Sequence, residues 1–377
     1  MERIDDPQKA TVALRSGQAW ASFCQELAEV AGDLQNPGAP TTPLDVAESY
    51  RFATRMLRAA FEQIMEGGDA RMPAFFDSLR PDVKSGWDNP DNTHSNAYIS
   101  GANTYRVSGT RGDSHYMSLG VYGGSLGREG GRRTVAYVDI DTLDIGPNGR
   151  FEVVLGKQRP SDAVNWIETD DDATTLMVRQ TFWDKSVEAR AELKIECLDA
   201  DPAPLDPVFV LNALRRSIRF IRGSNKIFFE NANEWRPHPN IFHPGKEGRA
   251  AETIGIPNMT YSSGCWEVAE NEALEIDLRP PRCRYWGLAL CNYWGESLDY
   301  QNWNVHTNAK RAKVRADGSV RVIMAHRDPQ LADATWLDVA GHTNGVWTLR
   351  WLEADSKPLP AVRVVPFEAF QRECVHE

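Results

Sequence analysis

The sequence lacks the features that mark several large protein classes. Six cysteines are scattered along the chain without a C-x-x-C pair: Cys24, Cys197, Cys265, Cys283, Cys291 and Cys374. This spacing excludes zinc-knuckle and thiol-redox motifs. Nowhere do about eighteen apolar residues follow one another, and the amino-terminal stretch MERIDDPQKATVALRSG has no apolar segment behind a basic start. The sequence therefore predicts a cytoplasmic protein without a membrane span, in which the cysteines are reduced thiols.

The sequence also has fewer basic than acidic residues. Lys and Arg number 42 against 53 Asp and Glu, a net charge of −11, which argues against a nucleic-acid groove or an anionic membrane surface as the main partner. The chain has no Walker loop, no G-x-G-x-x-G after a strand and no G-x-S-x-G. We therefore expect no cofactor, no metal, no nucleic acid and no membrane, and a small-molecule ligand as partner. The possibility of a homo-oligomer stays open.

The 377 residues exceed the roughly 250–300 at which single cores stop growing, so two or three structural units are expected. After the turn-rich stretch NPGAPTTP, Thr42 can cap a helix that begins at Pro43 and ends before Gly67. The same apolar spacing predicts an earlier helix, which carries Trp20, Phe23, Leu27 and Val30. A third amphipathic helix is predicted over 207–222, where an arginine stripe is expected to meet solvent or acidic neighbours.

Apolar and polar residues alternate with the period of a β-strand from residue 98 and again from about 274. The two regions resemble each other at an offset of 169 to 171 residues. HYMSLGVYGGSLG (115–127) aligns with RYWGLALCNYWGESLD (284–299), PNGRFEVVLG (147–156) with ADGSVRVIMA (316–325), and TTLMVRQ (174–180) with GVWTLRW (345–351). Tight-turn dipeptides explain part of this likeness, but four matches in one order, Asn165-Trp166 with Thr335-Trp336 included, predict two related antiparallel β units over 98–182 and 274–352.

Several long stretches resemble a known family. YWGLALCNYWGESLDYQNWNVHTN, DGSVRVIMAHRDP and TWLDVAGHTNGVWTLRW are similar to the carboxy-terminal pattern of the domain-of-unknown-function family numbered 1214, often joined to the domain numbered 1254. The upstream stretches WDNPDNTHSNAYI and RPHPNIF also match longer members, so the resemblance covers about residues 80–355. It implies jelly-roll-like β-sandwich units with an added helical part, and it supplies no settled catalytic residues or substrate.

The fold class we expect is mainly β with added helices, an α+β multidomain chain with an internal duplication. The predicted parts are a helical region over 1–80, a first β-sandwich unit over 81–200, a helical and loop insertion over 201–265, and a second β-sandwich unit over 266–377.

The leading candidate site is YWGESLDYQNWNVHTN, residues 293–308. In the repeat alignment Glu296 and Asp299 correspond to Gly124 and Gly127, so the strand frame does not require these carboxylates. Paired carboxylates near His306 suit general acid–base chemistry, because burial and like charge separate their pKa values. The sequence therefore predicts Glu296, Asp299 and His306 as catalytic residues, provided that a turn at Gly295 brings the two acids to one face.

Aromatic and amide side chains beside these acids suit a neutral ring-containing ligand, because rings stack and amides orient hydroxyl groups. We expect a pocket floored by Trp294 and Trp303, with the 86–98 loop or the 230–243 segment as a partial roof. The predicted ligand-binding residues are Tyr293, Trp294, Tyr300, Asn302, Trp303, Asn308, Asp88, Asn92, His94 and His238. The same residues also fit a polar hairpin edge or a subunit contact.

Two further clusters have simpler explanations. GWDNPDNTH (86–94) offers oxygens to a cation, but it lacks the calcium-loop spacing and is equally a turn. NEWRPHPNIFHP (233–244) holds His238 and His243, yet its prolines deny a regular helix to a zinc pair. His326 and His342 are expected to be structural.

Two functions from different classes fit these residues. One is a cofactor-independent hydrolase, lyase or isomerase acting on a sugar-like or terpenoid- or steroid-like molecule; the other is a non-catalytic binding or assembly module for a small molecule or carbohydrate. Twelve tryptophans exceed what two sandwich cores need, which favours a ligand or an interface in both cases. A closed pocket with converging carboxylates would indicate catalysis, and an exposed aromatic shelf would indicate binding.

Overall fold

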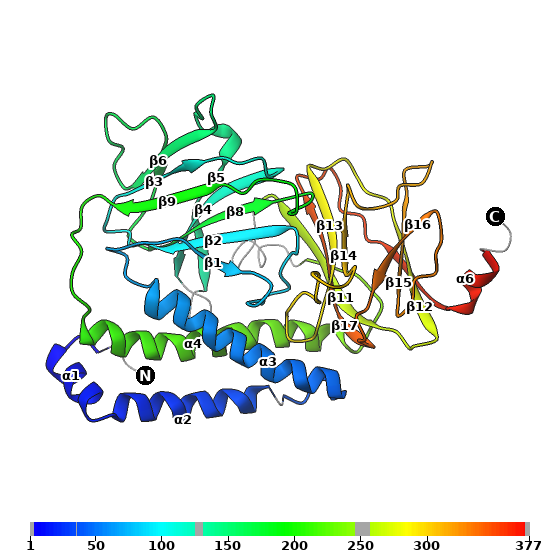
Figure 1. Ribbon diagram of the computed structural model, residues 1–377, viewed down its shortest axis with the longest axis horizontal. Helices are drawn as coiled ribbons and strands as arrows, with labels where there is room; N and C mark the ends of the chain where they lie inside the picture. Colours follow the sequence, from blue (N-terminus) through cyan, green and yellow to red (C-terminus); the bar gives the residue numbers. More distant parts are fainter. Residues whose placement is uncertain (1–3, 35, 125–130, 246–256, 374–377) are drawn as a thin grey trace. The chain divides into compact units, whose positions relative to one another are not determined.

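The computed structural model describes residues 4–34, 36–124, 131–245 and 257–373 (Figure 1). The chain forms two compact units, each built from separate stretches of sequence. Unit 1 comprises Met1–Pro37, Ala53–Val83 and Asn92–Lys226, and unit 2 comprises Gly38–Phe52, Lys84–Asp91 and Ile227–Glu377. The domain boundaries predicted from the sequence stay a prediction.

The helices follow the predicted apolar spacing and extend beyond it. Their bounds are α1 Pro7–Arg15, α2 Gln18–Asp33, α3 Pro43–Ala60, α4 Pro207–Trp235 and α6 Glu368–Glu373, with a π-helical turn at Phe61–Glu66 after α3. The sequence missed α1, which Asp6 caps by accepting from the backbone of Gln8 and Lys9. It also ended α4 near residue 222, but the apolar stripe continues beyond Gly223 with buried residues at Phe228, Phe229 and Ala232.

Unit 1 contains two sheets that share one core. The first has the order β1-β2-β8-β4-β5 and is antiparallel throughout; the second has the order β7-β6-β3-β9, with β6 and β7 parallel. Buried residues from both sheets pack together, among them Leu119, Val121, Val153 and Val178. The strands are β1 Phe76–Leu79, β2 Asn92–Tyr98, β3 Tyr105–Thr110, β4 Tyr116–Gly124, β5 Arg132–Asp139, β6 Arg150–Gly156, β7 Trp166–Glu168, β8 Ala173–Thr181 and β9 Glu192–Cys197.

Unit 2 repeats this plan in the yellow-to-red part of Figure 1. Its sheets have the orders β10-β11-β17-β13-β14 and β16-β15-β12-β18, and β15 and β16 form the parallel pair. The strands are β10 His243–Pro244, β11 Met259–Glu267, β12 Glu272–Leu278, β13 Tyr285–Cys291, β14 His306–Asn308, β15 Val320–Ala325, β16 Ala334–Asp338, β17 Asn344–Leu352 and β18 Ala361–Pro366.

Tryptophan dominates the interior of unit 2. Trp266, Trp347 and Trp351 are each 0% exposed, and they join Leu274 and Val322 in the core between the sheets. Trp286 and Trp294 are also buried. Much of the tryptophan that the sequence assigned to a ligand or an interface is therefore core packing.

The internal duplication is confirmed at the level of strand register. In unit 1 Leu119 pairs with Val178, and in unit 2 Leu288, 169 residues after the first, pairs with Leu349, 171 residues after the second. The indole nitrogens of Trp166 and Trp336 both donate to a carbonyl of the neighbouring parallel strand, at 3.2 and 3.1 Å. Both units also have strands outside the predicted ranges, and aligned positions 125–127 lie outside the described residues.

Two further sequence expectations concern membrane spans and cysteine residues. Among the helices that the structure describes, none has the length and apolarity needed to cross a membrane. Cys24, Cys197, Cys265, Cys283 and Cys291 are free thiols, and Cys374 lies outside the described residues.

Candidate functional site

A tight turn after β13 presents Glu296 inside unit 2. The backbone of Asn292 donates to the carbonyl of Glu296 at 2.8 Å, and that of Gly295 donates back to Asn292 at 3.2 Å. Gly295 has a φ of 85°, which favours glycine, and an added Cβ would lie 3.3 Å from the backbone nitrogen of Gly86. The turn that the sequence required at Gly295 is therefore present, and it directs Glu296 into the interior, where 1% of the residue is exposed.

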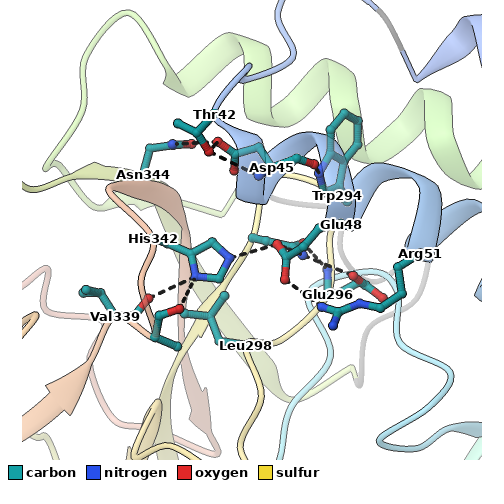
Figure 2. Close-up of polar contacts among 12 residues, drawn as sticks. Thr42, Asp45, Glu48, Arg51, Trp294, Glu296, Leu298, Val339, His342 and Asn344 are labelled. Atoms are coloured by element: carbon teal, nitrogen blue, oxygen red, sulfur yellow. Dashed lines mark hydrogen bonds and ion pairs between the residues drawn. The ribbon is translucent and has the colours of Figure 1, made fainter.

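Glu48 on α3 joins this turn to a histidine (Figure 2). One carboxylate oxygen of Glu48 accepts from Nε2 of His342 at 2.8 Å and from the amide of Asn292 at 2.9 Å, and the other accepts from Arg51 at 2.7 Å. The Asn292 amide also donates to Glu296 at 3.1 Å. We call Glu48, Asn292, Glu296 and His342 the Glu48 network.

The surroundings of His342 favour its protonated form. Its Nδ1 lies 3.0 Å from the carbonyl of Val339 and 3.1 Å from that of Ala340, and its Nε2 faces Glu48, so both ring nitrogens meet acceptors. Burial alone would lower the pKa of His342, but the hydrogen bond and charge of Glu48 raise it above its usual value. For Glu48, burial acts to raise the pKa, and His342, Asn292 and Arg51 together lower it. The result is a buried ion pair.

The amino-terminal turn of α3 is fixed beside this network. The backbone of Asp45 donates to Oγ1 of Thr42 at 3.2 Å, which confirms the predicted cap, and the Asp45 carboxylate accepts from Asn344 at 3.3 Å. The indole of Trp294 donates to the Asp45 carbonyl at 3.0 Å (Figure 2). Trp294 is 1% exposed and packs edge-on against Phe229. It is therefore a core side chain.

A second polar cluster surrounds Asp91, at the end of the 84–91 stretch. One carboxylate oxygen of Asp91 accepts from the hydroxyl of Tyr285 at 2.7 Å and from the amide of Asn308 at 3.0 Å; the other lies 3.2 Å from Nε2 of His306. Burial acts to raise the pKa of Asp91, but His306, Asn308 and Tyr285 lower it overall. Burial and the charge of Asp91 raise the pKa of Tyr285 well above its usual value. We call these four residues the Asp91 network.

His306 has an unsatisfied nitrogen. Its Nε2 lies 2.7 Å from a guanidinium nitrogen of the exposed Arg311 as well as 3.2 Å from Asp91, and its buried Nδ1 has no hydrogen-bond partner among the described residues. Nε2 donates to Asp91 when it carries a proton and accepts from Arg311 when it does not, so the two contacts belong to different tautomers of the ring. His306 itself is 6% exposed.

The 84–91 stretch is bound to the segment that follows β13. The Asp88 carboxylate accepts from the backbone and from the hydroxyl of Ser297, both at 2.7 Å. Lys84 donates to the carbonyls of Ser297 and Leu298 at 2.9 and 3.0 Å, and its ammonium lies 4.4 Å above the ring of Tyr300. Residues 84–91 thus contact part of the 293–308 cluster, and the roof predicted for residues 86–98 stays a prediction.

Asp299 and Trp303 belong to a different environment from Glu296. Asp299 is half-buried in a surface turn, where it accepts from the amide of Asn302 at 2.7 Å and from the backbone of Gln301 at 3.0 Å. Burial acts to raise the pKa of Asp299, but these hydrogen bonds lower it. Trp303 is 45% exposed whereas Trp294 is 1% exposed, so the two indoles do not form the floor of one enclosed pocket.

Other predicted residues are members of neither the Glu48 network nor the Asp91 network. Tyr293 is buried and donates to the side chain of Asn233 at 2.8 Å. Asn92 and His94 are on β2 in unit 1, where His94 accepts from Nε of Arg179 at 2.8 Å. His238 is exposed in the turn that follows α4. Within the part of the chain that the structure describes, no group of His, Cys, Asp and Glu is arranged to hold a metal ion.

Sequence reasoning missed Glu48, Asn292 and Tyr285, and it considered Asp91 only as part of a turn that could offer oxygens to a cation. One signal was available for Glu48. Asp45 and Glu48 precede the buried Phe52 at helical spacing, so these acids continue the apolar stripe of α3 and had to be buried with it.

Comparison with known proteins shows what this chain is similar to. The family model described as "Protein of unknown function (DUF1214)" matches residues 89–181 and 269–356, one segment in each repeat. A crystal structure of an uncharacterised protein from Burkholderia cenocepacia is 39% identical; the match covers 96% of this chain and 99% of that one, with a TM-score of 0.90. The VPA0106 protein of Vibrio parahaemolyticus is 13% identical over 84% of this chain and 98% of its own, with a TM-score of 0.49. No curated protein matches.

Proposed function

Because the chain belongs to the DUF1214 family of proteins of unknown function, we propose its function from the site: a non-catalytic module that binds a neutral, ring-containing ligand. The observation that carries this proposal is the separation of the reactive groups from the exposed aromatic group. Glu296, Glu48 and His342 are 1%, 6% and 5% exposed, whereas Trp303 is 45% exposed.

The buried networks are suited to holding the fold together. A general acid or base must reach the atom whose proton it transfers. Glu48 and His342 instead face partners from the chain itself, and these bonds tie α3 to the turn after β13 and to the turn before β17. The role that this arrangement supports is structural.

The surface turn at 299–304 supports ligand contact. The backbone of Trp303 donates to the Asp299 carbonyl at 3.0 Å, and the backbone of Asp338 donates to the Asn304 carbonyl at 2.8 Å, so the turn is anchored at both ends. Trp303, Gln301 and Asn302 are exposed. An indole face can stack on a sugar or another saturated ring while neighbouring amides bind hydroxyl groups. Anchoring the turn reduces the entropy lost on binding.

The test is binding of a panel of neutral oligosaccharides and uncharged terpenoid and steroid rings to the full chain. We expect Trp303→Ala to weaken the best-bound compound by roughly tenfold or more, because exposed aromatic anchors dominate such contacts. Trp20→Ala is the matched control, since Trp20 is 58% exposed on α2. The proposal fails if the wild-type chain binds no compound of the panel, or if Trp303→Ala binds as the wild type does.

A second candidate is the cofactor-independent enzyme, and one observation favours it. Asp91 faces His306 as an orienting carboxylate faces a catalytic histidine, and Nδ1 of His306 has no partner among the described residues. This function requires Arg311 to move away from the ring and Glu296 to exchange protons with a substrate. It therefore predicts that Glu296→Gln loses turnover without losing stability.

A further inference from the structure

Unit 1 has a polar face on the side of its first sheet that points away from the core. On β4, Leu119 and Val121 point into the core, so Tyr122 points to the other side. The register places Tyr98 of β2 and Tyr122 of β4 on either side of Thr175, in one row across the sheet. An added Cβ at Gly120 would lie 2.6 Å from the Tyr122 hydroxyl, so the absence of a side chain there makes room for this ring.

Two arginines cover these tyrosines. The guanidinium carbon of Arg132, on β5, lies 4.1 Å from the centre of the Tyr122 ring, and that of Arg216, on α4, lies 5.3 Å from the centre of the Tyr98 ring. Burial lowers the pKa of Arg132, and the like charge of Arg179 acts in the same direction. Arg132 and Arg216 are nonetheless partly exposed. The guanidinium group of Arg132 is therefore poorly solvated, although part of the residue stays exposed.

No carboxylate among the described residues forms an ion pair with Arg132 or Arg216, and in this they differ from three other arginines of unit 1. Arg133, the next residue on β5, pairs with Asp170 and Asp172. Arg190 pairs with Asp77, and Arg222 with Glu29. Concentrating poorly solvated guanidinium groups is unfavourable unless an anion compensates them.

The equivalent sheet face in unit 2 indicates which anion this face of unit 1 could bind. Tyr116 and Tyr285 occupy equivalent positions, since each pairs with the last residue of its neighbouring strand, β8 or β17. In unit 2 the hydroxyl of Tyr285 donates to a carboxylate of the chain, that of Asp91, at 2.7 Å. In unit 1 the hydroxyl of Tyr116 bonds to that of Tyr137. In unit 2 this face thus holds both a carboxylate of the chain and the guanidinium group of Arg350, whereas in unit 1 Arg132 and Arg216 lie on it without an ion-paired carboxylate among the described residues.

We propose that the face formed by Tyr98, Tyr122, Arg132 and Arg216 in unit 1 binds a small organic carboxylate. The guanidinium groups supply charge and paired N–H donors for the two carboxylate oxygens. The ring of Tyr98 supplies apolar contact for the carbon skeleton. This site goes beyond the function proposed for unit 2, because it lies on other residues and selects a charged ligand.

The experiment is calorimetric titration of the full chain with benzoate, hexanoate and succinate, and with benzamide and inorganic phosphate as comparisons. We expect at least one carboxylate to bind more tightly than about 1 mM and benzamide not to bind. Arg132→Met and Arg216→Met should each weaken that carboxylate roughly tenfold to hundredfold, because a hydrogen bond to a charged group is lost while the side chain keeps its length. Arg132→Lys should weaken it less than Arg132→Met.

Arg133→Met is the matched control, because Arg133 is adjacent on β5 and already paired with Asp170 and Asp172, and its affinity should equal that of the wild type. Thermal midpoints measured on each variant confirm that it is folded, and Tyr98→Phe tests the site without touching a charge. The proposal is overturned if no carboxylate binds, if benzamide binds as tightly as benzoate, if phosphate binds more tightly than every carboxylate, or if folded Arg132→Met and Arg216→Met bind as the wild type does.

Discussion

At the scale of single residues, the hydrogen bonds of His342 assign Glu48 a structural role. The loop before β17 places Ala340 at a φ of 50° and Gly341 at 81°, a left-handed pair that turns the carbonyls of Val339 and Ala340 toward the Nδ1 of His342. With Nδ1 donating there, Nε2 is fixed on Glu48 at 2.8 Å. The histidine is thereby held as a charged partner for a buried carboxylate, which is a structural task.

This pair predicts how stability depends on pH. Glu48 has a pKa lowered from 4.5, so its contribution is present above pH 4.5 and is lost as the pH falls through the lowered value. His342 has a pKa raised from 6.5, so its contribution is present below pH 6.5 and is lost as the pH rises through the raised value. The pair therefore stabilises the fold fully between pH 4.5 and 6.5.

We expect His342→Gln to lower the free energy of unfolding within that window by about 3 kcal/mol, because Glu48 loses its buried counter-charge. The fall in stability above the window should become shallower, since the histidine no longer titrates. Urea unfolding across the pH range measures both effects, and His238→Gln, at an exposed histidine, is the control. A His342→Gln variant with the wild-type pH profile would contradict the assignment of the buried ion pair.

At the scale of elements, the sequence predicted the strands well and the polar networks poorly. Strands such as β4, β6, β13 and β17 were found because alternation and turn residues are local signals. The parallel pairs β6–β7 and β15–β16 were missed, because a parallel neighbour leaves no local pattern. The fold class could therefore be predicted, but the sheet order could not.

The networks depended on contacts between distant parts of the sequence. Glu48 and His342 are 294 residues apart, and Asp88 and Ser297 are 209 apart. The sequence predicted Glu296, Asp299 and His306 as catalytic residues of one site because the three are close along the chain, but only Glu296 and His306 are buried. The turn at Asp299 shows why this fails: its carboxylate is used locally by Gln301 and Asn302.

The 84–91 stretch gives a prediction for an element that has no regular secondary structure. We expect Asp88→Ala to destabilise the fold, because the backbone N–H and the hydroxyl of Ser297 would each lose a buried acceptor at a cost of about 1–3 kcal/mol. Amide exchange at Ser297 should accelerate with it. Asp299→Ala, on the surface turn, should cost less than about 1 kcal/mol. Equal effects of the two substitutions in chemical unfolding would contradict the structural role given to this stretch.

At the scale of the whole molecule, the two related β units differ in which charged side chains they contain and in what these side chains face. Unit 2 carries its own carboxylates, Asp91 and Glu48, each facing a histidine of the same unit. In unit 1 Arg132 and Arg216 lie against tyrosine rings, and no carboxylate among the described residues forms an ion pair with either of them. The two proposed ligand sites differ accordingly: the surface turn of unit 2 is proposed to bind a neutral ring, and the arginine face of unit 1 a carboxylate.

The central claim is that the acid and histidine networks of unit 2 support the fold and do not react. The most direct test is the thermal midpoint of Glu296→Gln, measured with the affinity per folded molecule for the ligand that binds at Trp303. Gln keeps the shape of Glu296 and removes only its charge and its capacity to exchange a proton. We predict a midpoint lowered by several degrees with unchanged affinity, because an amide replaces the carboxyl group that accepts from Asn292 at 3.1 Å in the protein interior. An unchanged midpoint with lost turnover or lost binding would contradict the account and assign Glu296 to catalysis.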